Sequence, residues 1–90
     1  MAATTKSLAE RRATWIEANP LRRWRTETRT SILRAAAAIG CTTSTVQKWE
    51  YGASTLTDRF RPRIAALLGV SDEDLSKRWA LWERHEPKAA

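Results

Sequence analysis

The few glycines and prolines of this chain are placed so that they separate short helices. There are three of each, and between them apolar residues recur at helical spacing, whereas no alternating apolar stretch bounded by turn signals indicates a strand. Glycine readily takes the left-handed conformation that closes a helix, and proline fits the first turn of the next one. We therefore predict an all-α fold, a compact bundle of five to six helices.

Capping residues place the ends of these helices. An N-terminal helix is expected within residues 7–18. Asn19 caps a second helix, which begins at Pro20 and runs to about Thr28. Further helices are predicted at residues 32–39, 43–51, 61–68 and 71–85. With 90 residues the chain is expected to form one domain, 1–90, made of the N-terminal helix (7–18), a core (20–75), the C-terminal helix (71–85) and a frayed tail (86–90).

The positive charge of the chain is concentrated in its middle. The formal net charge is +6, and twelve of the sixteen basic residues are arginine. Residues 20–63 hold nine basic and three acidic side chains, whereas residues 64–90 hold four basic and five acidic ones. Such clustering favours a polyanionic partner, most simply a nucleic acid. The alternative, an arginine-rich solvated surface without a partner, explains the total charge but not its clustering.

The sequence carries no pattern typical of an enzyme. It has one cysteine and one histidine, so it can build neither a disulfide framework nor a metal cluster, and no nucleophile has a base nearby. It also lacks a glycine-rich phosphate loop, and we expect no cofactor and no small-molecule ligand. No apolar run approaches the roughly 18 residues of a membrane span, and the start of the chain lacks a secretory signal pattern, which favours the cytoplasm.

The tryptophans and the cysteine are expected to pack inside the fold. Leu21 and Trp24 are predicted to point inward from the second helix, and Trp49 from the fourth. Cys41 fills an apolar position as an unreactive thiol. The remaining tryptophans suit either core packing or a dimer face; they are Trp15, Trp79 and Trp82. This spacing argues against tryptophans that stack on single-stranded bases.

Residues 32–52 have the pattern of a helix-turn-helix motif. Two helices that cross at a tight turn need a small residue where they approach and a glycine in the turn, here Ala36 and Gly40. Val46 and Trp49 share the inner face of the second motif helix. Its outer face carries only polar side chains and none that is acidic, namely Thr43, Ser44, Gln47 and Lys48. A helix that reads bases in the major groove requires such a face.

This stretch resembles the Cro and lambdoid-repressor type of helix-turn-helix proteins, also called the xenobiotic-response-element class. The resemblance covers about residues 21–75 and rests on Leu21, Trp24 and Arg25, on Ala36, Gly40, Val46, Trp49, Glu50 and Gly52, and on residues 66–71. It implies a lambda repressor-like DNA-binding domain whose second motif helix enters the major groove of double-stranded DNA. It also implies a homodimer, formed in solution or only on DNA.

The resemblance further implies a role for each matching residue. Base contacts fall to Thr43, Ser44, Gln47 and Lys48; contacts to the DNA backbone fall to Arg29, Thr42, Thr45, Arg59, Arg61 and Arg63. Arg25 and Glu50 match an ion pair that ties the first helix to the recognition helix. Ile32 departs from the family pattern, which has a phosphate-binding glutamine there, and we expect Arg29 or Thr30 to replace that contact.

Together these features lead to one functional hypothesis and one alternative. The chain is expected to be a sequence-specific transcriptional regulator, a repressor or Cro-like protein of a phage or bacterium that lies on the host nucleoid. The alternative is a helix-turn-helix adaptor or antitoxin that acts by binding another protein. An adaptor would more often show an apolar or acidic outer face, and the polar, basic face of residues 43–48 favours DNA.

Overall fold

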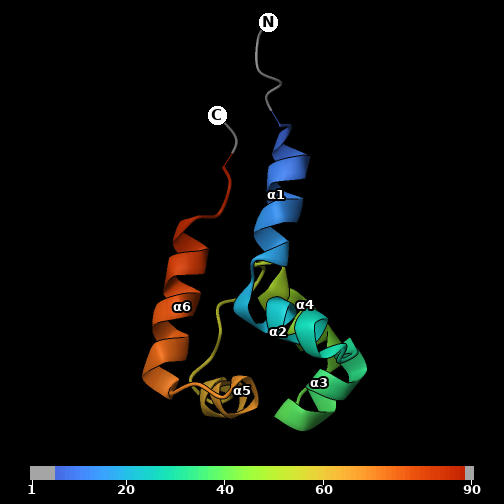
Figure 1. Cartoon of the computed structure of the whole chain (residues 1–90), viewed down its shortest axis with the longest axis vertical. Coiled ribbons are helices and arrows are strands. Elements are labelled where there is room, and N and C mark those ends of the chain that lie inside the picture. Colours follow the sequence, from blue (N-terminus) through green and yellow to red (C-terminus); the bar gives the residue numbers. More distant parts are fainter. Residues whose placement is uncertain (1–5, 89–90) are drawn as a thin grey trace, which may run out of the picture.

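Six α-helices account for most of the chain, and capping residues begin nearly all of them. The computed structural model describes residues 6–88, where the helices are α1 (Leu8–Glu17), α2 (Pro20–Thr28), α3 (Ile32–Ile39), α4 (Thr43–Glu50), α5 (Arg61–Leu68) and α6 (Asp72–Arg84) (Figure 1). No strand and no helix long and apolar enough to cross a membrane is present in this part of the chain. The all-α prediction is therefore confirmed; residues 89–90 of the predicted tail lie outside the described residues.

Local hydrogen bonds explain why the helices begin where they do. The side chains of Ser7, Ser31, Thr42 and Ser71 each accept a hydrogen bond from a backbone N–H in the first turn of the helix that follows. Asn19 accepts two, from Leu21 and Arg22. These bonds satisfy donors that a helix leaves unpaired at its N-terminus. Arg29, which closes α2, has a φ of 53°, a left-handed conformation that was not predicted for this residue.

Helices α2 to α6 enclose the hydrophobic core. Helix α3 packs against α4, and α5 packs against α6. The fully buried apolar side chains come from all five helices, and they include Leu21, Ile39, Val46, Trp49, Ile64 and Leu75. Two expectations need correction. Trp24 is only half-buried at the edge of the core. Leu56, in a loop expected to be polar, is a buried core residue, and this loop lies against α6, where Thr55 bonds to Glu83.

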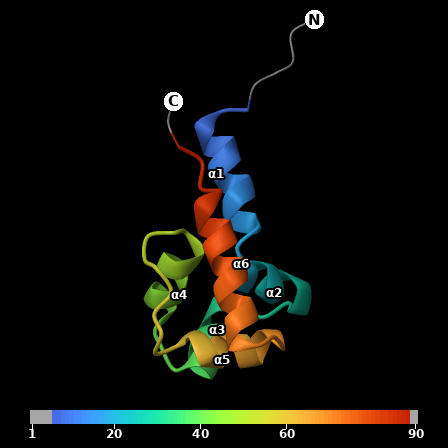
Figure 2. The same ribbon diagram turned by 90° about the vertical axis from the view of Figure 1, so that its left-hand side faces the viewer.

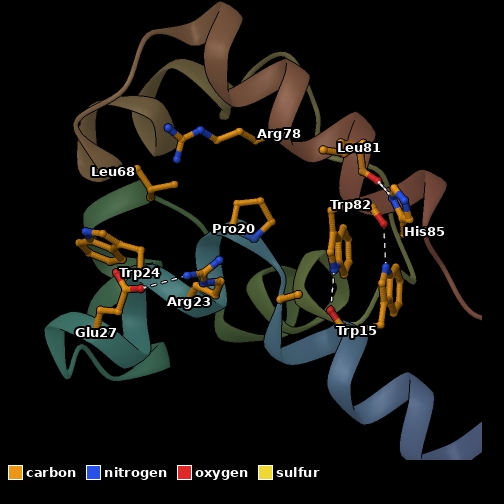
Figure 3. A pocket seen from close by; sticks show the side chains of 11 residues that line it. Trp15, Pro20, Arg23, Trp24, Glu27, Leu68, Arg78, Leu81, Trp82 and His85 are labelled. Carbon is orange, nitrogen blue, oxygen red and sulfur yellow. Dashed lines mark hydrogen bonds and ion pairs between the residues drawn. The ribbon is translucent and has the colours of Figure 1, made fainter.

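Helices α1 and α6 are joined by a reciprocal pair of buried tryptophans that belongs to this core. The rings of Trp15 and Trp82 are stacked, with their centroids 4.1 Å apart and their planes 2° from parallel. Each indole Nε1 donates a 2.7 Å hydrogen bond to the backbone carbonyl of the other tryptophan (Figure 3). Farther along, Arg12 forms a 3.1 Å ion pair with Glu86, in the predicted tail. The later turns of α1 therefore lie beside the end of α6, and the start of α1 extends beyond it toward one end of the long axis (Figures 1 and 2).

Replacement of either stacked tryptophan by phenylalanine is expected to destabilise the fold. Trp15→Phe and Trp82→Phe each leave a buried carbonyl without its donor, which costs about 1–3 kcal/mol of unfolding free energy. Because the two bonds share one stack, we expect the double variant to lose less than the sum. Urea unfolding followed by circular dichroism measures these effects. Trp24→Phe is the control, at a half-buried ring outside the stack, and losses as large in the control would contradict the expectation.

Candidate nucleic-acid interface

The turn between α3 and α4 is held by backbone hydrogen bonds. Gly40 closes α3 with a φ of 90°, and the N–H groups of Gly40 and Cys41 both donate to the carbonyl of Ala36, at 2.8 and 3.0 Å. Thr42 then caps α4 by accepting a hydrogen bond from the N–H of Thr45. The turn is therefore as tight as a helix-turn-helix requires, because only three residues lie between the end of α3 and the start of α4.

Burial of one face of α4 decides which side chains the other face presents. Val46 and Trp49 are buried against the core, so α4 cannot rotate without exposing them. On the opposite face Ser44, Gln47 and Lys48 are exposed, and Thr43 is half-buried. Within residues 6–88 the side chains of these four residues make no hydrogen bond or ion pair to other protein groups. The structure thus brings the four predicted base-contacting residues together on one open helix face.

The two threonines beside this face point their hydroxyl groups at each other. The Oγ1 atoms of Thr42 and Thr45 lie 3.0 Å apart and share a hydrogen bond. Thr42 is exposed and Thr45 is half-buried at the N-terminus of α4. The helix dipole places partial positive charge at this end of α4, which favours a negative group. The predicted contacts of Thr42 and Thr45 to DNA phosphates fit this charge.

The C-terminal end of α4 is clamped to α2. Nε and Nη2 of Arg25 each donate a 2.7 Å hydrogen bond to a carboxylate oxygen of Glu50, whose side chain is 1% exposed. Arg22 approaches the same carboxylate at 3.6 Å. Nδ2 of the fully buried Asn19 donates to the carbonyl of Trp49 at 3.4 Å, a contact that sequence reasoning missed. The hydrogen bond to Glu50 raises the pKa of Arg25 above its ordinary value, so this guanidinium stays charged throughout the working pH range.

The three arginines around the start of α5 have different surroundings. Arg59 is exposed, with its guanidinium 5.1 Å from the ring centroid of Phe60, and makes no ion pair within the described part of the chain. Arg61 forms ion pairs with Asp58 and Asp72, which offset its charge. Nη1 of Arg63 donates to the carbonyl of Ile39, at the end of α3. Of the three side chains, only that of Arg59 forms no hydrogen bond or ion pair with another group in the described part of the chain.

The segment before α3 presents a further cation. Arg29 is exposed at the left-handed end of α2, and Thr30 directs its carbonyl to Nη1 of Arg25. Ile32 packs against the core, which agrees with the absence of a polar side chain at that position. Arg29 is therefore available to a polyanion that passes the start of α3.

The main groove of the molecule lies away from α4. It has a volume of about 530 Å³ and is lined by residues of α1, α2, α5, α6 and the adjoining turns, but by none of α3 or α4 (Figure 3). Cys41, expected to be fully buried, is half-buried, and burial still raises the pKa of its thiol. The outer face of α4 is therefore an open surface rather than a pocket, which suits a large partner better than a small ligand.

Comparison with known proteins agrees with this geometry. The family model described as a helix-turn-helix domain matches residues 18–77, which include α2 to α5 and the first part of α6. No curated protein and no solved structure matches the chain.

Loss of the buried carboxylate at the end of α4 is expected to destabilise the fold strongly. Glu50→Gln leaves the guanidinium of Arg25 without its counter-charge, and we expect unfolding free energy to fall by about 3 kcal/mol. Glu27→Gln is the matched control, because the Arg23–Glu27 pair is 3.7 Å long and its side chains are 64% and 66% exposed. The control is expected to lose less than about 1 kcal/mol. Urea denaturation at neutral pH measures the free energy of unfolding of both variants. Equal losses of this free energy would refute a structural role for the Arg25–Glu50 pair.

Proposed function

The chain belongs to the helix-turn-helix domain family, and on this basis we propose that it is a sequence-specific regulator of transcription that binds double-stranded DNA. The observation that carries the proposal is the outer face of α4, where Ser44, Gln47 and Lys48 are exposed and polar while the inner face is anchored in the core. An α-helix fits the major groove of B-form DNA, and residues near its N-terminus reach base edges there.

Side-chain chemistry suggests what each base contact reads. The amide of Gln47 pairs with N6 and N7 of adenine, and the ammonium group of Lys48 donates to O6 or N7 of guanine. Thr43 and Ser44 contribute hydroxyl groups, which discriminate less between bases. This division makes Gln47 and Lys48 the main determinants of sequence preference.

Contacts to the DNA backbone supply most of the affinity in this proposal. Thr42 and Thr45 hold phosphate at the N-terminus of α4, and Arg29 and Arg59 hold it on either side of the motif. Arg61 contributes less, because Asp58 and Asp72 already offset its charge.

The biological role follows from the resemblance to Cro and lambdoid repressors. We place the protein among phage or bacterial repressors or Cro-like switches, acting on DNA in the host cell as a homodimer formed in solution or on its site. One α4 of eight residues reads a short half-site, and two copies one duplex turn apart read a palindrome.

Selection of bound sites from a random pool of DNA duplexes tests this function directly. We expect an enriched sequence, with twofold symmetry if the protein binds as a dimer. Binding to the selected duplex should weaken with salt, with a slope of log K against log salt of about −5 to −7 for roughly 6 to 8 neutralised phosphates. No retention on duplex DNA at low salt would overturn the proposal and favour an adaptor that binds another protein.

Substitutions in the two groups of contacts are expected to have different effects on binding. Gln47→Ala and Lys48→Ala should each cost about 1–3 kcal/mol on the selected duplex and relax base preference, because they remove base contacts. Arg59→Ala should weaken binding to all duplexes alike and flatten the salt slope by about one.

Titrations of the selected and a scrambled duplex measure both effects. Lys77→Ala is the control, an exposed lysine of α6 that pairs with Glu73. It should change neither preference nor affinity by more than about twofold. If the variants at Gln47, Lys48 and Arg59 all acted equally on every duplex, the division of contacts would be wrong.

A further inference from the structure

Arg63 reaches from α5 to the end of α3 instead of extending freely into solvent. Its Nη1 atom donates a 3.0 Å hydrogen bond to the carbonyl of Ile39, the last residue of α3. Carbonyl groups at the end of a helix lack partners within the helix and carry partial negative charge. A guanidinium suits this position, because it supplies both a donor and a positive charge.

Gly40 provides the room for this contact. A Cβ atom added at Gly40 would lie 2.5 Å from Nη1 of Arg63, which is too close for the guanidinium to stay in place. The left-handed φ of 90° already favours glycine here. The glycine therefore adopts the backbone conformation of the turn, and its lack of a Cβ atom leaves the space that the guanidinium of Arg63 occupies.

Helix α5 contacts both helices of the motif. Phe60, at the start of α5, packs on Trp49 of α4 with ring centroids 5.6 Å apart. Helix α5 is thus in contact with α4 through Phe60 and with the end of α3 through Arg63.

We infer that Arg63 is a positioning residue, which acts on DNA recognition by holding the turn at Gly40 and thus the start of α4, and not by binding phosphate. The inference deepens the proposed function and rests on it for its effect on DNA. The coupling between Arg63 and Gly40 on which the inference depends can be measured in the protein without DNA.

A double-mutant cycle on the free protein tests the coupling. Gly40→Ala and Arg63→Ala should each speed hydrogen exchange of the Cys41 amide, which bonds to Ala36, by about tenfold, because each breaks the Arg63–Ile39 contact. In the double variant, exchange of the Cys41 amide should be accelerated by less than the product of the two single effects. Gly69→Ala is the matched control, since Gly69 also ends an eight-residue helix with positive φ but has nothing within 4 Å of its added Cβ. The effects of Gly69→Ala and Arg63→Ala on the exchange rate should multiply in the double variant. If the effects of Gly40→Ala and Arg63→Ala also multiplied, the inference would be overturned.

DNA binding separates positioning from phosphate contact. Lysine keeps the charge of Arg63, but its ammonium group ends one bond short of the Nη1 atom that meets Ile39. Arg63→Lys should therefore weaken binding to the selected duplex about tenfold, as Arg63→Ala does, and leave the salt slope unchanged. A phosphate contact predicts instead that lysine restores affinity and that alanine flattens the slope by about one, as expected for Arg59→Ala. Restoration by lysine would overturn the inference.

The two experiments fail independently. If no DNA sequence is selected but the exchange effects at Gly40 and Arg63 are coupled, the proposed function falls while the coupling stands. If DNA is bound and the effects multiply, the inference falls while the function stands.

Discussion

The carboxylate of Glu50 is the contact on which the orientation of α4 most depends. A charge buried among helices is tolerated only when its partners are fixed, and here Arg25 supplies two hydrogen bonds to it from α2. Asn19 holds the same end of α4 through a backbone carbonyl. Val46 and Trp49 bury the inner face, so the outer face of α4 is fixed in direction by contacts at its end and along its length. A surface that reads base edges needs this rigidity, because hydrogen bonds to bases are directional.

The helices could be predicted because their signals are local. Ser31, Thr42 and Ser71 cap the helices that follow within a single turn, and Gly40 ends α3 for reasons that its neighbours alone decide. The inner and outer faces of α4 also follow from spacing along one helix. The resemblance to a known family added the Arg25–Glu50 pair, which joins residues 25 positions apart and has no local signal.

Features that depend on distant parts of the chain were not predictable in the same way. Leu56 is buried although its loop is otherwise polar, and Trp24 is only half-buried because it lines the groove between α2, α5 and α6. The arginines near α5 look alike in sequence, yet their partners differ: carboxylates for Arg61, a carbonyl for Arg63 and an aromatic face for Arg59. Side-chain type alone does not reveal which arginine keeps its charge available, since that depends on which acidic or carbonyl groups the fold brings near.

The reciprocal bonds between Trp15 and Trp82 have a consequence for how the chain acquires its structure. The two indoles are 67 positions apart, so α1 leaves the ribosome long before its partner exists. Contacts among α2, α3 and α4 can form earlier, because the Arg25–Glu50 pair and the contact between α3 and α4 bridge much shorter separations. Attachment of α1 to α6 is therefore expected to be one of the last steps of folding, because the indole of Trp15 stays uncovered until residue 82 has been made and has left the ribosome.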